Sequence, residues 1–137
     1  MTTKSSGFSL IELLVVIAII GVLSSVGVVT YSSYVQGTKK TSAESAMQQI
    51  SLAQTEEYSN SGEYYTQVNT DSCTPTSTTS DDIMTTLFGG ANIIDDSIGF
   101  EMCIADDGVS FIVVASQGAG QCTITMTANG IWTRELC

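Results

Sequence analysis

Glu12 is the residue that most needs a chemical reason. It is the one charged side chain in an apolar run that begins with GFSLIELLVV (7–16) and continues almost unbroken to Val29. An ionised side chain inside a membrane span costs about 2.5 to 3.5 kcal/mol on insertion scales, so the acid must do something that offsets this cost. A buried carboxylate is best used as one half of an ion pair. Glu12 is therefore a candidate for pairing with a cation.

The four cysteines indicate an exported protein with disulfide bonds. The chain has no histidine and no CxxC pair, which argues against a zinc ribbon or a thioredoxin-like redox site. Long runs of Ser and Thr fit the same oxidising compartment. Three pairings are open to the cysteines, which are Cys73, Cys103, Cys122 and Cys137.

The remaining polar residues form no catalytic set. Without histidine, a Ser-x-x-Lys pair or a glycine-rich phosphate loop, the usual acid, base and nucleophile combinations cannot be assembled, so we expect neither enzymatic activity nor a cofactor. Three pairs of aspartates offer oxygen ligands to calcium, but their spacing matches no EF-hand loop. We expect them to serve in caps and turns rather than to bind a metal: Asp81-Asp82, Asp95-Asp96 and Asp106-Asp107.

Length and charge limit the classes of partner. With 14 acidic against 4 basic residues and a formal charge of −10, the chain lacks the positive surface expected of a protein that binds nucleic acid or an anionic membrane surface. Its 137 residues make one domain. If the first fifty or so residues form an anchor and a spine, about 85 remain for a globular head with a thin core.

The apolar N-terminal run has three interpretations. A secretory signal peptide would be cut near Ser25-Val26-Gly27, but Glu12 lies inside its apolar stretch. A plain signal anchor needs about 20 apolar residues, which the segment from Phe8 to Val29 supplies. That second interpretation explains neither Glu12 nor the Gly7-Phe8 junction.

The third interpretation explains these features, because GFSLIELLVVIAIIGVLSSVGVVTYSSY (7–34) closely resembles the N-terminal signature of type IV pilins and pseudopilins. In that family a short basic leader ends in Gly, a prepilin peptidase cleaves before a Phe that becomes N-methylated, and a Glu follows four residues later. Gly7, Phe8 and Glu12 match these three positions. The mid-helix glycine and the tyrosines after the apolar run are matched by Gly21, Tyr31 and Tyr34.

The resemblance implies a life cycle and a set of partners. Residues 1–7 would be a cleaved leader, 8–33 a transmembrane and filament-core half of a helix, and 34–137 a globular head. The precursor would sit in the inner membrane, meet the prepilin peptidase and the assembly machinery, and polymerise into a helical homo-oligomeric filament at the cell surface. The alternatives are a pseudopilin of a type II secretion system, a minor pilin, or a membrane-anchored binding or enzymatic head that never polymerises.

The physics of cleavage gives Glu12 its partner. Cutting after Gly7 turns the peptide nitrogen of Phe8 into a cationic amine, one helical turn from Glu12, where the helix dipole also favours a carboxylate. In a bundle of low dielectric, Glu12 of an incoming subunit would pair with the Phe8 amine of a neighbour and fix the axial register. The simpler alternative is that Glu12 only lies at the level of the lipid headgroups and has no such partner.

The helix is expected to run from about Ser9 to Tyr58, with Asn60 or Gly62 as a left-handed end. Pilins often carry a proline at the position of Val29. Without it, the Gly21–Val29 segment either melts during assembly or uses its glycines for close packing. The apolar stripe of the second half is Val35, Ala43, Ala46, Met47, Ile50, Ala53 and Tyr58.

The head is predicted to add a short helix and a meander, giving an α+β fold: a long N-terminal helix packed on a small antiparallel four-stranded sheet, as in type IV pilins. Within the polar, variable connection at 59–97, a helix over 81–88 would be capped by Ser80 and favoured by two aspartates at its start. In the meander at 98–137, Asp-Gly and Asn-Gly turns separate strand candidates at 98–105, 109–117, 121–128 and 131–136. CTITMTANGIWTRELC (122–137) resembles the C-terminal disulfide loop of pilin heads. This resemblance implies that Cys122 pairs with Cys137 and Cys73 with Cys103.

Overall fold

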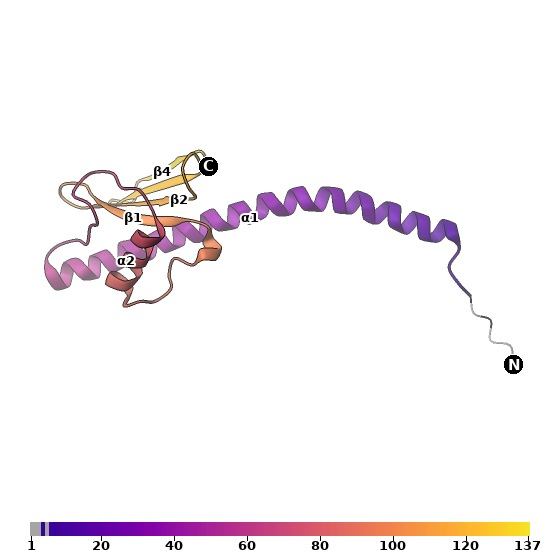
Figure 1. Cartoon of the computed structure of the whole chain (residues 1–137), viewed down its shortest axis with the longest axis horizontal. Coiled ribbons are helices and arrows are strands. Elements are labelled where there is room, and N and C mark those ends of the chain that lie inside the picture. Colours follow the sequence, from indigo (N-terminus) through magenta and orange to yellow (C-terminus); the bar gives the residue numbers. More distant parts are fainter. Residues whose placement is uncertain (1–3, 5) are drawn as a thin grey trace. The chain divides into compact units, whose positions relative to one another are not determined.

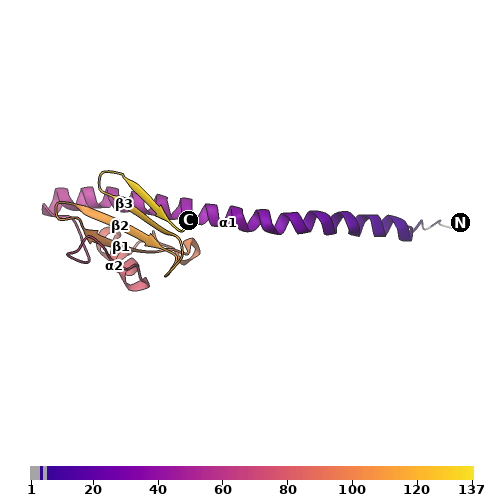
Figure 2. The same ribbon diagram turned by 90° about the horizontal axis from the view of Figure 1, so that it is seen from above.

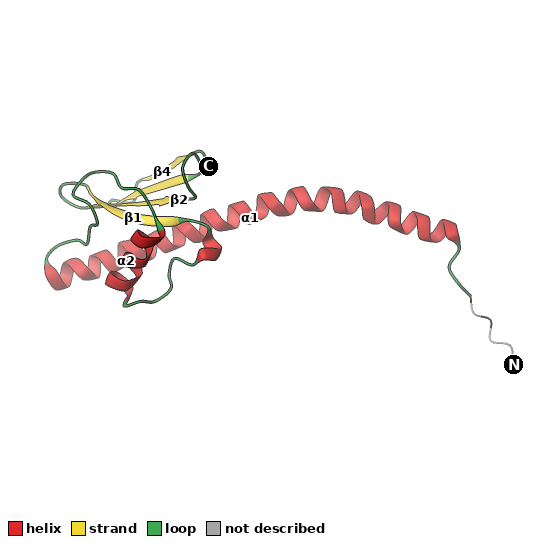
Figure 3. Cartoon of the chain, in the orientation of Figure 1, coloured by secondary structure: helices red, strands yellow, loops and turns green. Residues whose placement is uncertain are grey.

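The computed structural model describes residue 4 and residues 6–137, and its longest element is helix α1, Leu10–Ser61 (Figure 1). The chain divides into two compact units, one ending at Gly37 and one running from Thr38 to Cys137, and α1 contributes to both. The helix is uninterrupted at Gly21, Gly27 and Val29, so the isolated chain shows no melted segment there (Figure 3).

The C-terminal end of α1 is set by a glycine cap. The helix continues three residues past the predicted end at Tyr58, and Gly62 follows it with φ of +83°. The amide of Gly62 donates to the carbonyl oxygen of Tyr58 at 2.8 Å. Of the two residues proposed for the left-handed end, the structure uses Gly62, which has no Cβ to clash in this conformation.

The second unit contains the predicted four-stranded antiparallel meander. The strands are β1 (Glu101–Asp106), β2 (Phe111–Ser116), β3 (Thr123–Thr127) and β4 (Trp132–Glu135), and they pair in chain order (Figure 2). Glycines with positive φ stand in the β1–β2 and β3–β4 turns, at Gly108 and Gly130. The expected α+β fold of type IV pilins is confirmed.

The core lies between the second half of α1 and one face of this sheet. Burial alternates along β2 and β3, which is the pattern of strands with one covered face. The helix contributes Ala43, Ala46, Met47 and Ile50, and the facing strands contribute Met102, Ile104, Phe111, Val113, Ala115, Ile124 and Met126. The predicted stripe was wrong at its end, because Tyr58 is 50 % exposed and stacks on Tyr64 instead of entering the core.

Helix α2, Ser77–Phe88, begins four residues before the predicted start, and Ser80 is not its cap. Thr76 is the N-cap: its hydroxyl accepts from the amide of Thr79, whose own hydroxyl accepts from the amide of Thr76. This reciprocal capping box satisfies two backbone donors and overrides the weak helix propensity of Ser and Thr. Asp81 and Asp82 therefore fall outside the first turn, and the predicted dipole role for them was wrong.

The outer edge of β1 is covered by the connection that precedes it. Gln67 bonds Ile104 twice, through its own amide to the carbonyl oxygen and through Oε1 to the amide, each at 3.0 Å. The hydroxyl of Thr79 donates to the carbonyl oxygen of Met102 at 2.7 Å, and Ser80 Oγ accepts from the amide of Met102 at 2.9 Å. These bonds remove an open strand edge that would otherwise pair with other chains.

Gln54 is a buried polar residue that the sequence pattern did not single out. Its side chain is fully buried on α1, where Nε2 donates to the carbonyl oxygen of Tyr65 at 2.6 Å and Oε1 accepts from the amide of Tyr65 at 2.9 Å. The side chain of Gln54 thus bonds the backbone of Tyr65 in the way that a neighbouring strand would. It fixes the start of the connection against the helix.

Replacing Gln54 with Leu should destabilise the head, because both backbone groups of Tyr65 lose their partner. We expect the free energy of unfolding to fall by about 1 to 3 kcal/mol. Urea unfolding of the full chain in detergent, followed by the fluorescence of its single tryptophan, Trp132, measures this change. The matched control is Gln48→Leu at an exposed position of the same helix, which should change stability by less than about 0.5 kcal/mol. Equal effects of the two variants would contradict the proposed role of Gln54.

Candidate functional site

The Gly7-Phe8 junction lies outside the helix and is open to solvent. Residues 6–9 have no helical or strand structure and are exposed, and Phe8 is 89 % exposed. The junction stands two residues before the first residue of α1. An enzyme could therefore reach this peptide bond without unwinding the helix.

Glu12 forms a capping box with Ser9. The carboxylate Oε2 accepts from the amide of Ser9 at 2.8 Å and from its hydroxyl at 2.9 Å, while the amide of Glu12 donates to Ser9 Oγ at 3.3 Å. This role was not predicted above, although Ser9-x-x-Glu12 before an apolar run is the known signature of a capping box. The helix start is thus defined by residues downstream of the Gly7-Phe8 bond, and it does not depend on the leader.

The first unit presents a continuous apolar surface. Every residue from Leu10 to Tyr34 is exposed, and α1 contains a stretch that is long and apolar enough to cross a membrane. Phe8 and Glu12 line the same shallow groove of about 370 Å³ with Ile11, Val15 and Val16. A second open groove of about 640 Å³ runs along the helix past Ser24, Gly27, Val28 and Tyr31, where small side chains leave room for a packed neighbour.

Two disulfides join Cys73 to Cys103 and Cys122 to Cys137, and no described cysteine is free. The Cα atoms of the two pairs are 6.2 Å and 4.5 Å apart. The first bond ties the connection that precedes α2 to β1. The second joins the residue before β3 to the segment that follows β4.

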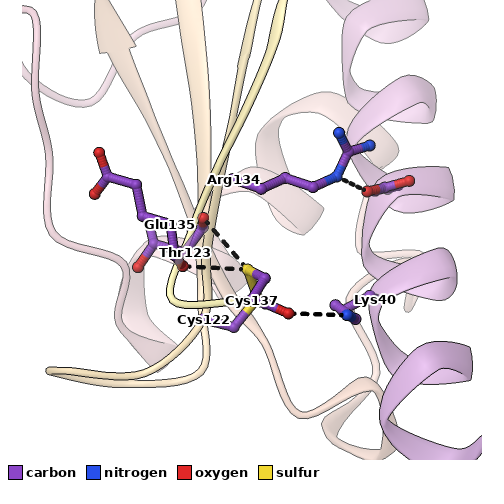
Figure 4. A network of polar contacts seen from close by, with 7 residues as sticks. Lys40, Cys122, Thr123, Arg134, Glu135 and Cys137 are labelled. Carbon is purple, nitrogen blue, oxygen red and sulfur yellow. Dashed lines mark hydrogen bonds and ion pairs between the residues drawn. A yellow bond between two sulfur atoms is a disulfide. The ribbon is translucent and has the colours of Figure 1, made fainter.

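Contacts of two cationic side chains fasten β4 and the segment that follows it to α1 (Figure 4). Lys40 Nζ donates to the main-chain oxygen of Cys137 at 3.3 Å, and Arg134 Nε donates to Glu44 Oε1 at 2.7 Å. The hydrogen bond to Glu44 and the negative charge of that carboxylate raise the pKa of Arg134 above its ordinary value. Arginine is charged throughout the physiological pH range in any case, so this shift reflects a favourable contact and changes no charge state.

Two of the three aspartate pairs have local backbone roles. Asp95 Oδ1 accepts from the amide of Ser97 and caps the short 3₁₀ helix Asp96–Ile98. Asp106 Oδ1 accepts from the amide of Gly108 at 2.7 Å in the β1–β2 turn. These bonds match the cap and turn roles expected at 95–96 and 106–107.

Comparison with known proteins identifies the N-terminal segment. Residues 2–28 match the family model of the prokaryotic N-terminal methylation motif, which is the type IV pilin and pseudopilin signature. The chain thus has the N-terminus of a type IV pilin-like prepilin, followed by the α+β fold of that family. No curated protein and no solved structure matches the chain.

The Cys122–Cys137 bond should contribute strongly to the stability of this small head. A separation of 15 residues corresponds to about 3 kcal/mol of restricted unfolded-state entropy. We expect a Cys122→Ser, Cys137→Ser double variant to lose about 2 to 4 kcal/mol of unfolding free energy in urea. Non-reducing peptide mapping of the unaltered protein should recover Cys122 linked to Cys137. A peptide that joins Cys73 to Cys137 would refute this pairing.

Proposed function

We propose that this chain is the structural subunit of a type IV pilus-like surface filament. It is inserted in the inner membrane as a prepilin, cleaved after Gly7, N-methylated at Phe8 and polymerised by bundling of its apolar helices. The observation that carries the proposal is the exposed apolar helix surface from Leu10 to Tyr34. A lipid bilayer covers such a surface before assembly, and the helices of other subunits cover it afterwards.

Cleavage supplies the positive charge that Glu12 needs as a partner. Once the Gly7-Phe8 bond is cut, the nitrogen of Phe8 becomes an amine one residue before the Ser9 cap. Glu12 Oε2 already accepts two hydrogen bonds from Ser9, which leaves its second carboxylate oxygen available for an amine of a neighbouring subunit. A pair of this kind fixes axial register, because a subunit displaced along the bundle would bury both charges without partners.

Processing is tested by the mass of the mature chain. The surface filament fraction should contain a polypeptide that begins at Phe8 and carries one added methyl group. N-terminal peptide mass spectrometry measures both features. A Gly7→Leu variant, which changes the junction but leaves the Ser9-Glu12 cap intact, should retain its leader and remain in the membrane fraction. A mature chain that starts after Gly27, or one that keeps Met1, would exclude the proposed processing.

The charge of Glu12 is tested by Glu12→Gln, which deletes the charge while keeping a side chain that can complete the capping box. The precursor should still be inserted and cleaved. Filament yield should fall sharply, because the neighbour's amine is left unpaired in low dielectric, a loss of about 3 to 5 kcal/mol. Electron microscopy of sheared filaments, with the variant as sole subunit, gives the yield.

Ser9→Ala is the matched control for this experiment. It weakens the cap by about 1 kcal/mol but leaves the carboxylate charged, so its filament yield should stay near that of the unaltered chain. Equal losses in Ser9→Ala and Glu12→Gln would assign Glu12 to the helix cap alone. An unaltered chain that is processed but never enters filaments would favour an anchored, non-polymerising head.

A further inference from the structure

The basic side chains that remain after removal of the leader gather at one end of the second unit. Of the four basic residues, Lys4 lies in the leader, which leaves Lys39, Lys40 and Arg134. Arg134 bonds Glu44, and Lys40 bonds the main-chain oxygen of Cys137. The side chain of Lys39 lies beside Gly99. Its Nζ is 3.6 Å from the position that a Cβ atom on this residue would occupy. These contacts place all three cations near the start of the helix segment that belongs to this unit.

The opposite end of the unit carries acids and no lysine or arginine. Glu56 and Glu57 lie in the last turns of α1, Glu63 follows the helix, and Asp106 and Asp107 begin the β1–β2 turn. Contact between the rings of Tyr64 and Phe111, 5.1 Å apart, holds the helix end beside that turn. A cleft of about 430 Å³ opens between them and is lined by Tyr58, Glu63, Tyr64, Asn69, Asp106 and Ser110, among others.

These two ends cannot meet within one subunit. From Lys40 to Glu56 the helix rises about 1.5 Å per residue, so the two side chains start roughly 24 Å apart along its axis. Both views of the head place the C-terminal residue near the first part of this helix segment and the β1–β2 turn near its end (Figures 1 and 2). The only ion pair among the described residues joins Arg134 to Glu44, so the acids at 56, 57, 63, 106 and 107 have no cationic partner there.

We propose that the acidic end of one head, formed by Glu56, Glu57, Glu63, Asp106 and Asp107, receives Lys39 and Lys40 of a second copy of this chain. The inference rests on the proposed filament, in which heads repeat along one axis, and it names the contact between successive heads. The cleft beside Glu63 and Asp106 accepts a lysine side chain, with Tyr58 and Tyr64 as a wall along its aliphatic stem. Each contact is an ion pair between one lysine and the carboxylates that it touches.

The attraction between two heads must come from individual ion pairs, because the cationic end is not positive overall. Asp95 and Asp96 precede Gly99 and therefore lie near Lys39, and Glu44 is already paired with Arg134. Attraction between the ends thus depends on which side chains touch rather than on net charge. Without the lysines, however, the contact would join one acidic surface to another, which is unfavourable at this net charge.

Zero-length crosslinking of filaments tests the contact directly. Filaments assembled from a mixture of isotopically heavy and light chains are treated with a carbodiimide, which joins an amine to a carboxylate that it touches. We expect peptides of mixed isotope composition that link Lys39 or Lys40 to Glu63, Asp106 or their acidic neighbours. Mixed peptides that link these lysines only to other acids, or no mixed peptides at all, would overturn the inference.

Charge reversal tests whether the contact matters for assembly. Lys39→Glu with Lys40→Glu should lower filament yield at least tenfold, and adding Glu56→Lys with Glu63→Lys should restore much of it. The matched control adds Asp81→Lys with Asp82→Lys on the exposed face of α2, which should restore nothing. Disulfide formation and the amount of mature subunit in the membrane report whether each variant folds and inserts.

The outcomes separate the two proposals. Absence of filaments from the unaltered chain would overturn both. Normal filaments from the unaltered chain and from the lysine-reversed variant would overturn only the contact between heads. If lysine reversal lowers membrane accumulation, and the Glu56 and Glu63 reversals do not rescue yield, the lysines serve the anionic lipid surface and the inference fails.

Discussion

An apolar helix surface that its own chain does not cover is the constraint on which this protein depends. From Leu10 to Tyr34 no residue is buried, so this part of α1 requires another apolar environment. A bilayer and a bundle of identical helices both provide one. In the proposed filament, transfer from bilayer to bundle would exchange one apolar environment for another, so hydrophobic burial would not select the position of a subunit in the bundle. That selection requires polar contacts of defined geometry.

Glu12 is suited to such a contact because its two carboxylate oxygens can serve different partners. One oxygen accepts from the amide and the hydroxyl of Ser9 and fixes the first turn of α1. The other remains available to a charged group outside the helix. A carboxylate held by its cap also loses little side-chain freedom when it forms an ion pair, which lowers the entropic cost of the contact.

The head is under a different constraint, because it must form a stable core from few residues. The second half of α1 supplies one side of that core, and two disulfides tie the connection and the segment after β4 to the sheet. Side chains of Gln67, Thr79 and Ser80 cover the outer edge of β1. At the other margin of the sheet, Lys40 and Arg134 fasten the end of β4 to the helix. The bonds cluster where a thin core alone would leave strands loosely held.

The sequence by itself determined the features that depend on local chemistry: the apolar run with its acid, the Gly7-Phe8 junction, the positions of the strands and the glycine turns. Periodicity and turn residues act over a few positions, so they can be read without a fold. The start of α2 is also local, because the capping box joins Thr76 to Thr79, although the sequence pattern favoured Ser80. Only the tertiary structure decided that Ser80 became a partner of Met102. It also decided the burial of Gln54 and the gathering of the cations near Cys137. These features depend on which distant segments meet, and the spacing of residues along one chain does not contain that information.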